Sequence, residues 1–295
     1  MENAPWIALE SLDTLWFQVA GTRCNLECAH CFISCSPHND SYGFLSLDVV
    51  RERLNESIRW GVRDYYFTGG EPFLNRDMVP ILELALQYGP ATVLTNATVL
   101  KSDWVARLRR AEEATQYCLE FRVSIDGPSP ETNDPVRGEG TFVRAMKGVE
   151  LLVDHGFLPI ITMTRVWEEE NDQEVLGQFR DVLREHGYTR PRLKVLPRLK
   201  IGAESCRTEG YGQFERVTSE LLDGFDTGQL VCSHSRVITD RGVAVCPILL
   251  DEPSAIMGDS LDDANRAFPL AHGACYTCYQ YGAICTNPSS KPVEA

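Results

Sequence analysis

Short apolar runs alternate along the chain with longer amphipathic stretches. The run Leu15 to Ala20 is almost entirely apolar, whereas Leu47 to Trp60 has apolar residues at helical spacing. Ser46 stands just before the second stretch and favours the capping position of a helix. Runs of the first kind predict buried strands and stretches of the second kind predict surface helices, so the pattern indicates repeated strand–helix units.

Six strands and the helices that separate them are predicted in this way. The strands are expected at 15–20, 64–68, 91–95, 119–125, 158–164 and 192–196, and the helices at 47–60, 77–88, 102–113, 141–155 and 171–186. Strands separated by helices of this length form right-handed crossovers and a parallel sheet. The prediction is an α/β fold in which the loops after the strands carry the chemistry.

The character of the chain changes after Gly202. Residues 203–228 are rich in Gly, Glu and Thr and are expected to form a linker with one helix from Gln213 to Leu222. From Cys232 onward cysteines become dense. We therefore expect a first domain at 1–202, a small cysteine-rich domain at 203–287 and a polar, disordered tail at 288–295.

Composition and charge exclude several classes of protein. The hydrophobic fraction of 43% and the charged fraction of 24% are typical of soluble globular proteins. The first fifteen residues contain no basic residue and no continuous apolar run, which argues against a signal or transit peptide, and no segment has the length of a membrane span. Eleven cysteines without an export signal favour metal ligation in a reducing, cytoplasmic setting. The net charge of −14 argues against nucleic-acid binding.

Three cysteines lie close together directly after the first predicted strand. Cys24, Cys28 and Cys31 have the spacing C-x3-C-x2-C. A structural zinc site and a ferredoxin-type cluster each take four protein ligands, whereas three thiolates around a cubic iron–sulfur cluster leave one iron open; taken alone, the spacing also fits half of a zinc site or a chance arrangement. Gly69-Gly70-Glu71 follows the second predicted strand, where two glycines let the backbone pass close to a ligand.

Together these two motifs resemble those of the radical S-adenosylmethionine (radical SAM) enzymes. The resemblance implies a partial (β/α)6 barrel of the TIM type. It also implies a 4Fe-4S cluster whose open iron chelates SAM and reductively cleaves it to a 5′-deoxyadenosyl radical. A low-potential electron donor, flavodoxin or ferredoxin, is the expected protein partner, and neither nucleic acid nor a membrane is expected.

The same resemblance implies which residues contact SAM. The Gly-Gly-Glu turn would hold the SAM ammonium, Ser124 and an arginine would hold its carboxylate, and a side chain of the cysteine loop would pack against the adenine. The residues expected in these roles are His30, Gly69, Gly70, Glu71, Asn96, Ser124 and Arg137. Arg144 and Arg165 are alternatives to Arg137.

Two further residues near these motifs have expected roles. Asp126, in the segment Ser124-Ile125-Asp126-Gly127, is expected to face the substrate and to act as a catalytic base. Cys35 lies four residues after Cys31 and is expected to be a free thiol that lines the loop, because a fourth ligand would close the iron that SAM needs.

A second group of cysteines lies near the end of the chain. Cys232 and Cys246 flank a hairpin-like run with its turn at 240–242, and Cys275 and Cys278 form a C-x2-C pair. Two such pairs hold either zinc or a 4Fe-4S cluster. The arrangement resembles the Twitch domain, a shortened SPASM domain with one auxiliary 4Fe-4S cluster. Cys285 is left over and is an alternative to one of the four ligands.

The leading interpretation is a radical SAM oxidoreductase that acts on a small alcohol or sugar-like molecule, with the auxiliary cluster as electron acceptor or substrate anchor. A peptide-modifying maturase, which crosslinks, epimerises or oxidises side chains, is the alternative. Because only 23 residues precede Cys24, an N-terminal peptide-recognition domain is not expected, and this favours the small molecule. A non-enzymatic zinc or electron-transfer protein is a third hypothesis, which leaves the Cys24–Cys31 loop beside Gly69-Gly70-Glu71 unexplained.

Overall fold

The computed structural model describes residues 4–282, and its largest element is a nine-stranded sheet. Six of the strands follow one another in the sheet in chain order and are parallel, which confirms the predicted α/β architecture. They are β2 (Thr14–Gln18), β3 (Asp64–Thr68), β4 (Ala91–Thr95), β5 (Leu119–Ser124), β6 (Ile160–Thr164) and β7 (Arg192–Leu196). The sheet is open, with β7 at one edge and β10 (Ile256–Gly258) at the other.

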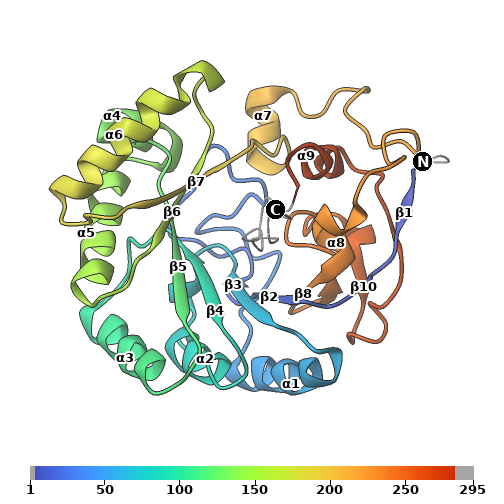
Figure 1. Cartoon of the computed structure of the whole chain (residues 1–295), viewed down its shortest axis with the longest axis horizontal. Helices are drawn as coiled ribbons and strands as arrows, with labels where there is room; N and C mark the ends of the chain where they lie inside the picture. Colours follow the sequence, from blue (N-terminus) through green and yellow to red (C-terminus); the bar gives the residue numbers. More distant parts are fainter. Residues whose placement is uncertain (1–3, 283–295) are drawn as a thin grey trace, which may run out of the picture.

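Helices connect the parallel strands and cover the outer side of the curved sheet (Figure 1). Ser46 caps the first of them as predicted, since its hydroxyl accepts a hydrogen bond from the Val49 amide. One helix after β5 was not predicted; it begins with Pro130 behind a capping box of Ser129 and Thr132. The helices are α1 (Leu47–Ser57), α2 (Met78–Ala85), α3 (Ser102–Glu113), α4 (Pro130–Arg137), α5 (Thr141–Asp154) and α6 (Asp172–Glu185).

The core lies between the parallel strands and the helices. In β2 every residue is buried, and Phe17 stacks on Phe67 of β3 with ring centroids 5.2 Å apart. Leu54 of α1, Leu82 of α2 and Leu108 of α3 have no exposed surface and pack into the same cluster. Burial of this apolar area is the main favourable contribution to folding.

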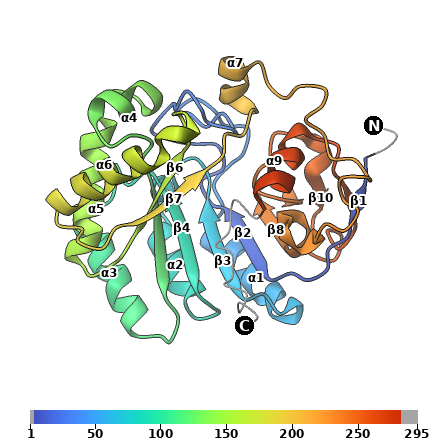
Figure 2. The ribbon, with the colours of Figure 1, turned by 45° about the horizontal axis from the view of Figure 1, so that its top comes forward.

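The C-terminal part of the chain continues the sheet on the free side of β2. The strand β8 (Ser235–Thr239) pairs with β2 in parallel, and β9 (Gly242–Ala244) and β10 follow in antiparallel orientation. The predicted hairpin around residues 240–242 is therefore confirmed. Figure 2 shows this region beside the parallel strands. It also contains α8 (Val231–His234), α9 (Gly273–Tyr281) and a small sheet of β1 (Trp6–Ile7) with β11 (Phe268–Pro269).

The predicted helix from Gln213 to Leu222 is wrong. This segment consists of turns, and the nearby helix α7 (Ser205–Thr208) has only four residues. Phe214 is 86% exposed and Val217 is the one buried residue between 213 and 222, so the segment has too narrow an apolar face to stabilise a helix. The domain boundary at residue 203 stays a prediction, because β8, β9 and β10 extend the same sheet. Between residues 4 and 282, no helix has both the length and the apolar character required to cross a membrane.

Replacement of Phe67 by alanine is expected to destabilise the protein strongly. The side chain is fully buried at the centre of β3, so its removal leaves a cavity and should lower the free energy of unfolding by about 3–5 kcal/mol. Phe214→Ala removes the same side chain from the surface and should change stability by less than about 0.5 kcal/mol. Urea unfolding of both variants tests the expectation, and similar values for the two would contradict it.

Candidate functional site

The loop after β2 brings its three cysteines to one pocket of about 210 Å³. Cys24, Cys28 and Cys31 all line this pocket. Two short hydrogen bonds shape the loop: the Cys24 amide donates to the Ser36 carbonyl at 3.2 Å and the Cys31 amide to the Cys28 carbonyl at 3.1 Å. Burial raises the pKa of Cys24 to about 12 and that of Cys28 to about 11.

The Gly69-Gly70 turn after β3 packs directly against the start of this cysteine loop. The Gly70 amide donates to the Gly21 carbonyl at 3.0 Å, and the Glu71 amide donates to the Arg23 carbonyl at 2.9 Å. A Cβ atom on Gly70 would lie 2.0 Å from the Arg23 carbonyl oxygen, so only glycine fits there. Both glycines line the pocket, as the motif predicts.

Glu71 points into the protein and does not line the pocket. Its carboxylate is completely buried and accepts hydrogen bonds from the Phe73 amide at 3.0 Å, the Thr95 hydroxyl at 2.8 Å and the Asn96 amide at 2.8 Å. Burial raises the pKa of Glu71 to about 7, although these three donors act in the opposite direction. The observed geometry therefore differs from the expected contact with the SAM ammonium: Glu71 fixes the end of β4 beside the Gly-Gly turn.

Asp126 is also buried behind the pocket wall, where the side chains of His30 and Arg137 enclose it. One carboxylate oxygen lies 2.6 Å from His30 Nε2 and 2.6 Å from Arg137 Nε, and the other accepts the Thr164 amide at 2.7 Å. Burial alone would raise its pKa, but Arg137 and His30 outweigh this effect and hold the pKa well below the usual range.

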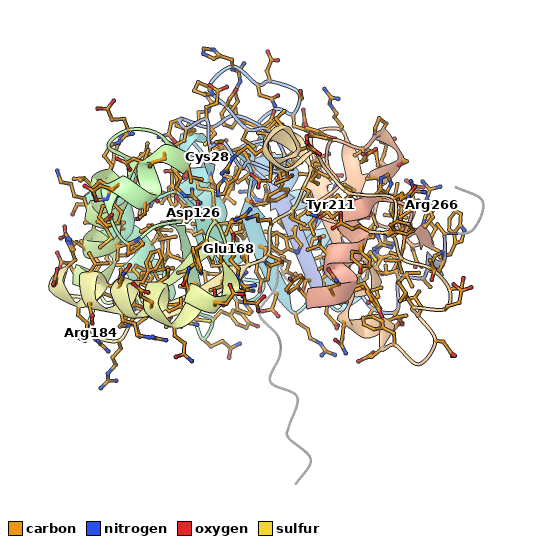
Figure 3. The ribbon with its side chains drawn as sticks, turned by 90° about the horizontal axis from the view of Figure 1, so that it is seen from above. Cys28, Asp126, Glu168, Arg184, Tyr211 and Arg266 are labelled. Carbon is orange, nitrogen blue, oxygen red and sulfur yellow. The ribbon has the colours of Figure 1, made fainter. Side chains whose placement is uncertain are left out.

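This arrangement corrects the expectation that Asp126 is a catalytic base facing the substrate. A carboxylate with so low a pKa is a poor proton acceptor, and both of its oxygens already have partners. The side chains that do line the pocket are His30 and Arg137, so Asp126 positions them. In Figure 3 Asp126 is labelled close to Cys28, on the side of the parallel strands.

The structure distinguishes the three arginines considered for a carboxylate. Arg137 lines the pocket and its side chain is 11% exposed. Arg144 is exposed on α5, and Arg165 is paired with Asp172 at 2.7 Å. Of the three, only Arg137 lines the pocket. Ser124 and Asn96 line it too, and Asn96 reaches the cysteine loop through a 2.9 Å hydrogen bond to Asn25.

Several pocket residues were missed in the sequence. Glu204 is 2% exposed and lines the pocket, and among residues 4–282 it is the only carboxylate that does so. It arrives there because the Ala203 amide donates to the Cys31 carbonyl at 2.9 Å, a contact that no local sequence pattern predicts. Trp16 and Arg122 also line the pocket, both on strands whose residues look like ordinary core positions in the sequence.

Cys35 also lines the pocket, next to the three-cysteine group. Its amide donates to Cys31 Sγ at 3.2 Å, and its thiol donates to the same sulfur and lowers the pKa of Cys31. As a hydrogen-bond donor, Cys35 stabilises the thiolate form of Cys31. This role does not require Cys35 to be a cluster ligand.

The second group of cysteines surrounds another cavity. Cys232 of α8, Cys246 after β9, and Cys275 and Cys278 of α9 all line it. The other lining side chains are apolar, and burial raises the pKa of each thiol, to about 12 for Cys232 and Cys278. Among residues 4–282, no three Cys, His, Asp or Glu side chains lie close enough together for a single metal ion. Cys285 lies outside the described residues.

A family model with the description "Radical SAM superfamily" matches residues 19–182, which is more than half of the chain. The chain therefore belongs to the radical SAM superfamily, a family of enzymes that use SAM and a 4Fe-4S cluster. The matched range begins just before the cysteine loop and ends within α6, so it contains both motifs and most of the strands that carry the pocket.

Relatives with different printed names resemble the chain. It is 29% identical over 152 residues to the antilisterial bacteriocin subtilosin biosynthesis protein AlbA of Bacillus subtilis, a match that covers 50% of this chain and 33% of AlbA. It is 34% identical over 181 residues to the AdoMet-dependent heme synthase of Methanosarcina barkeri, covering 61% and 47%. The chain thus spans between a third and a half of these two proteins.

A solved structure supports the fold. Streptococcus suis SuiB bound to the precursor peptide SuiA superposes with a TM-score of 0.64 at 16% identity, covering 86% of this chain and 65% of SuiB. At that identity the similarity establishes the α/β fold with its mostly parallel sheet and nothing about the substrate.

The first pocket suits the cofactors of this family. Cys24, Cys28, Cys31 and Cys35 line it, and the first three have the spacing of this family's cluster motif, so a cluster held by these three keeps one iron open. Trp16 Nε1, Gln18 Oε1 and His30 Nδ1 belong to lining residues and are buried without a hydrogen-bond partner among the described residues. Unpaired buried polar atoms are costly, so this wall suits a polar ligand such as SAM.

Glu71→Gln is expected to lower the free energy of unfolding while leaving the affinity for SAM nearly unchanged. The amide would place an NH2 group opposite one of three donors, which should cost about 1–3 kcal/mol of unfolding free energy. Glu185→Gln, at an exposed position of α6, is the control and should leave stability unchanged. Denaturant unfolding and SAM titration are the measurements. A loss of SAM affinity of about tenfold or more at unchanged stability would show instead that the carboxylate contacts SAM.

Proposed function

We propose that this chain is a radical SAM oxidoreductase with two 4Fe-4S clusters. Cys24, Cys28 and Cys31 would hold the first cluster, and Cys232, Cys246, Cys275 and Cys278 the second. The observation that carries the proposal is the division of the cysteines: the motif cysteines Cys24, Cys28 and Cys31, together with Cys35, line a pocket with unpaired polar atoms in its wall, and four others line a separate apolar cavity. When bound, the first cluster and SAM supply a 5′-deoxyadenosyl radical that abstracts a hydrogen atom.

The residues proposed to hold SAM are those that line the first pocket beside the three cysteines. Arg137 offers a planar fork of donors that suits a carboxylate, and Ser124 adds a hydroxyl. The Gly69-Gly70 backbone allows close approach, and Asn96 and His30 offer polar edges. Glu71 and Asp126 are not proposed to contact SAM. Glu71 holds Asn96 in position and Asp126 holds Arg137 in position.

The two cavities are adjacent along one short segment. Pro247 lines the first pocket, and its neighbour Cys246 lines the second. An electron that leaves a substrate in the first pocket therefore has an acceptor proposed one residue away in the chain. This arrangement favours an oxidation, in which the substrate loses a hydrogen atom, then a proton and an electron. The proposed domain division, 1–202 with the first cluster and 203–287 with the second, follows the same partition of the cysteines.

Glu204 is the residue that we propose to accept the proton in place of Asp126. It is the carboxylate that lines the pocket, and its ion pair with the exposed Arg207, at 3.2 Å, leaves accepting capacity on the oxygens. A hydroxyl or ammonium group of a substrate would donate to such a carboxylate. The leading substrate class is thus a small alcohol or sugar-like molecule that is oxidised to a ketone.

A peptide substrate is the second candidate. The printed names of two similar proteins favour it, since AlbA takes part in bacteriocin biosynthesis and SuiB was solved with a precursor peptide. The name of another relative, the AdoMet-dependent heme synthase, refers to a small molecule and favours the first class. Product analysis distinguishes the two classes: a ketone two mass units below a small alcohol supports the first, and a crosslinked, epimerised or oxidised peptide supports the second.

Iron content tests the two-cluster proposal. Reconstituted wild-type protein should hold about eight irons per chain, and the triple variant Cys24→Ala, Cys28→Ala, Cys31→Ala should hold about four and cleave no SAM. Cys118 and Cys206 are exposed, so Cys118→Ala with Cys206→Ala is the matched control and should keep all eight. Saturation of the wild type at about four irons would contradict the second cluster, and a colourless zinc protein would contradict both.

Glu204→Gln should separate radical formation from product formation. The variant is expected to form 5′-deoxyadenosine but to release oxidised product on the order of 10²–10⁴-fold more slowly, because general-base help has been removed. Glu209→Gln, at an exposed position of the same segment, should behave as wild type. The assay compares both products in anaerobic turnover with candidate alcohols. Normal product formation by Glu204→Gln would exclude its role as the base.

A further inference from the structure

Arg236 is a buried cation beside the four-cysteine cavity. It is the second residue of β8, and only 1% of it is exposed. Its guanidinium donates only to neutral backbone carbonyls: Nε to Ala264 at 2.9 Å, Nη1 to Cys232 and Ser235 at 2.7 Å each, and Nη2 to Arg266 at 3.2 Å. Within residues 4–282 it forms no ion pair with a carboxylate.

Such a charge is expensive to bury. Carbonyl groups satisfy its hydrogen bonds but leave its charge uncompensated, and buried charges in proteins are normally paired with an opposite charge. An arginine guanidinium is protonated at neutral pH. Because Nη1 donates to the carbonyl of Cys232, which lines the cavity, the charge lies directly beside the four cysteines.

Within the described part of the chain, no charged side chain lines the cavity itself. Apart from the four cysteines, its lining side chains are Leu, Val, Ile, Phe and Ala. In such apolar surroundings a nearby charge is weakly screened and acts strongly on whatever occupies the cavity. Four thiolates around a metal centre carry a net negative charge, and this is the counter-charge that Arg236 lacks in the rest of the described protein.

We propose that Arg236 is the internal counter-charge of the second cluster and raises its reduction potential. The inference rests on the proposed function. One-electron reduction adds a negative charge in the cavity, and a fixed cation stabilises the reduced form more than the oxidised form. A higher potential makes this site a better acceptor for the electron that leaves the substrate. The hydrogen bonds of Arg236 to Ala264 and Arg266 serve a separate, structural role.

Charge-removing and charge-keeping variants separate these two roles. Arg236→Gln removes the charge, whereas Arg236→Lys keeps it but cannot reproduce four hydrogen bonds. Arg266→Gln is the matched control, because it removes an arginine charge from the exposed outer side of the same region (Figure 3). Each full-length protein is reconstituted anaerobically, its iron is counted, and it is titrated with dithionite or titanium(III) citrate under EPR observation. Added SAM identifies the first cluster by the change in its signal.

The expected result is a lower midpoint potential for the SAM-insensitive signal in Arg236→Gln only. At a fixed potential the ratio of reduced to oxidised second cluster should fall about tenfold, which corresponds to about 59 mV for one electron. Arg236→Lys, Arg266→Gln and the SAM-sensitive signal should match the wild type. If Arg236→Gln fails to hold the second cluster, Arg236→Lys should still hold about eight irons.

Two results would overturn the inference while leaving the proposed function intact. The first is a wild-type potential in Arg236→Gln with about eight irons bound. The second is an equal shift, or an equal loss of iron, in Arg236→Lys, which would assign the effect to lost hydrogen bonds. A wild type that holds about four irons would overturn the second cluster and this inference together.

Discussion

The parallel pairing of β2 with a strand on each side is the constraint on which the rest of the structure depends. On one side β3 pairs in register, with Gln18 opposite Thr68, so that the cysteine loop and the Gly-Gly turn leave the sheet at the same edge. The hydrogen bonds from the turn to Gly21 and Arg23 are possible only with that register. On the other side β8 pairs with β2 and brings the second group of cysteines beside the first.

Three buried ionisable side chains around these sites have three different kinds of partner, and the kind of partner indicates the role of each side chain. Asp126 has a cationic partner in Arg137 and lies 2.6 Å from His30 as well, so its charge is compensated and it serves to orient both side chains. Glu71 has only neutral donors and its pKa rises to about 7, so it ties two strand ends together. Arg236 has only neutral acceptors, and its imbalance points to an anionic neighbour.

Most of the fold and part of the site could be predicted from the sequence. Strands 64–68, 91–95 and 192–196 were predicted to the residue because apolar runs ended by Gly, Pro or polar residues leave little choice of boundary. The pocket positions of the cysteines and of Gly69 and Gly70 followed from their place after parallel strands. The inward directions of Glu71 and Asp126 did not, because a place at a strand end does not determine where a side chain points.

The pocket position of Glu204 could not be predicted from the sequence. The contact that brings it there is also part of how the pocket is closed. The residue belongs to no motif, and it reaches the pocket only because the chain leaving β7 crosses back to the cysteine loop at Cys31. The same loop is held from the C-terminal side, since the Tyr42 hydroxyl donates to the Leu250 carbonyl at 2.5 Å and the Gly43 amide to Asp240 at 2.7 Å. The C-terminal region thus packs on the cysteine loop and lines the pocket through Pro247, as well as carrying four cysteines, so the two groups of cysteines are positioned by one connected set of contacts.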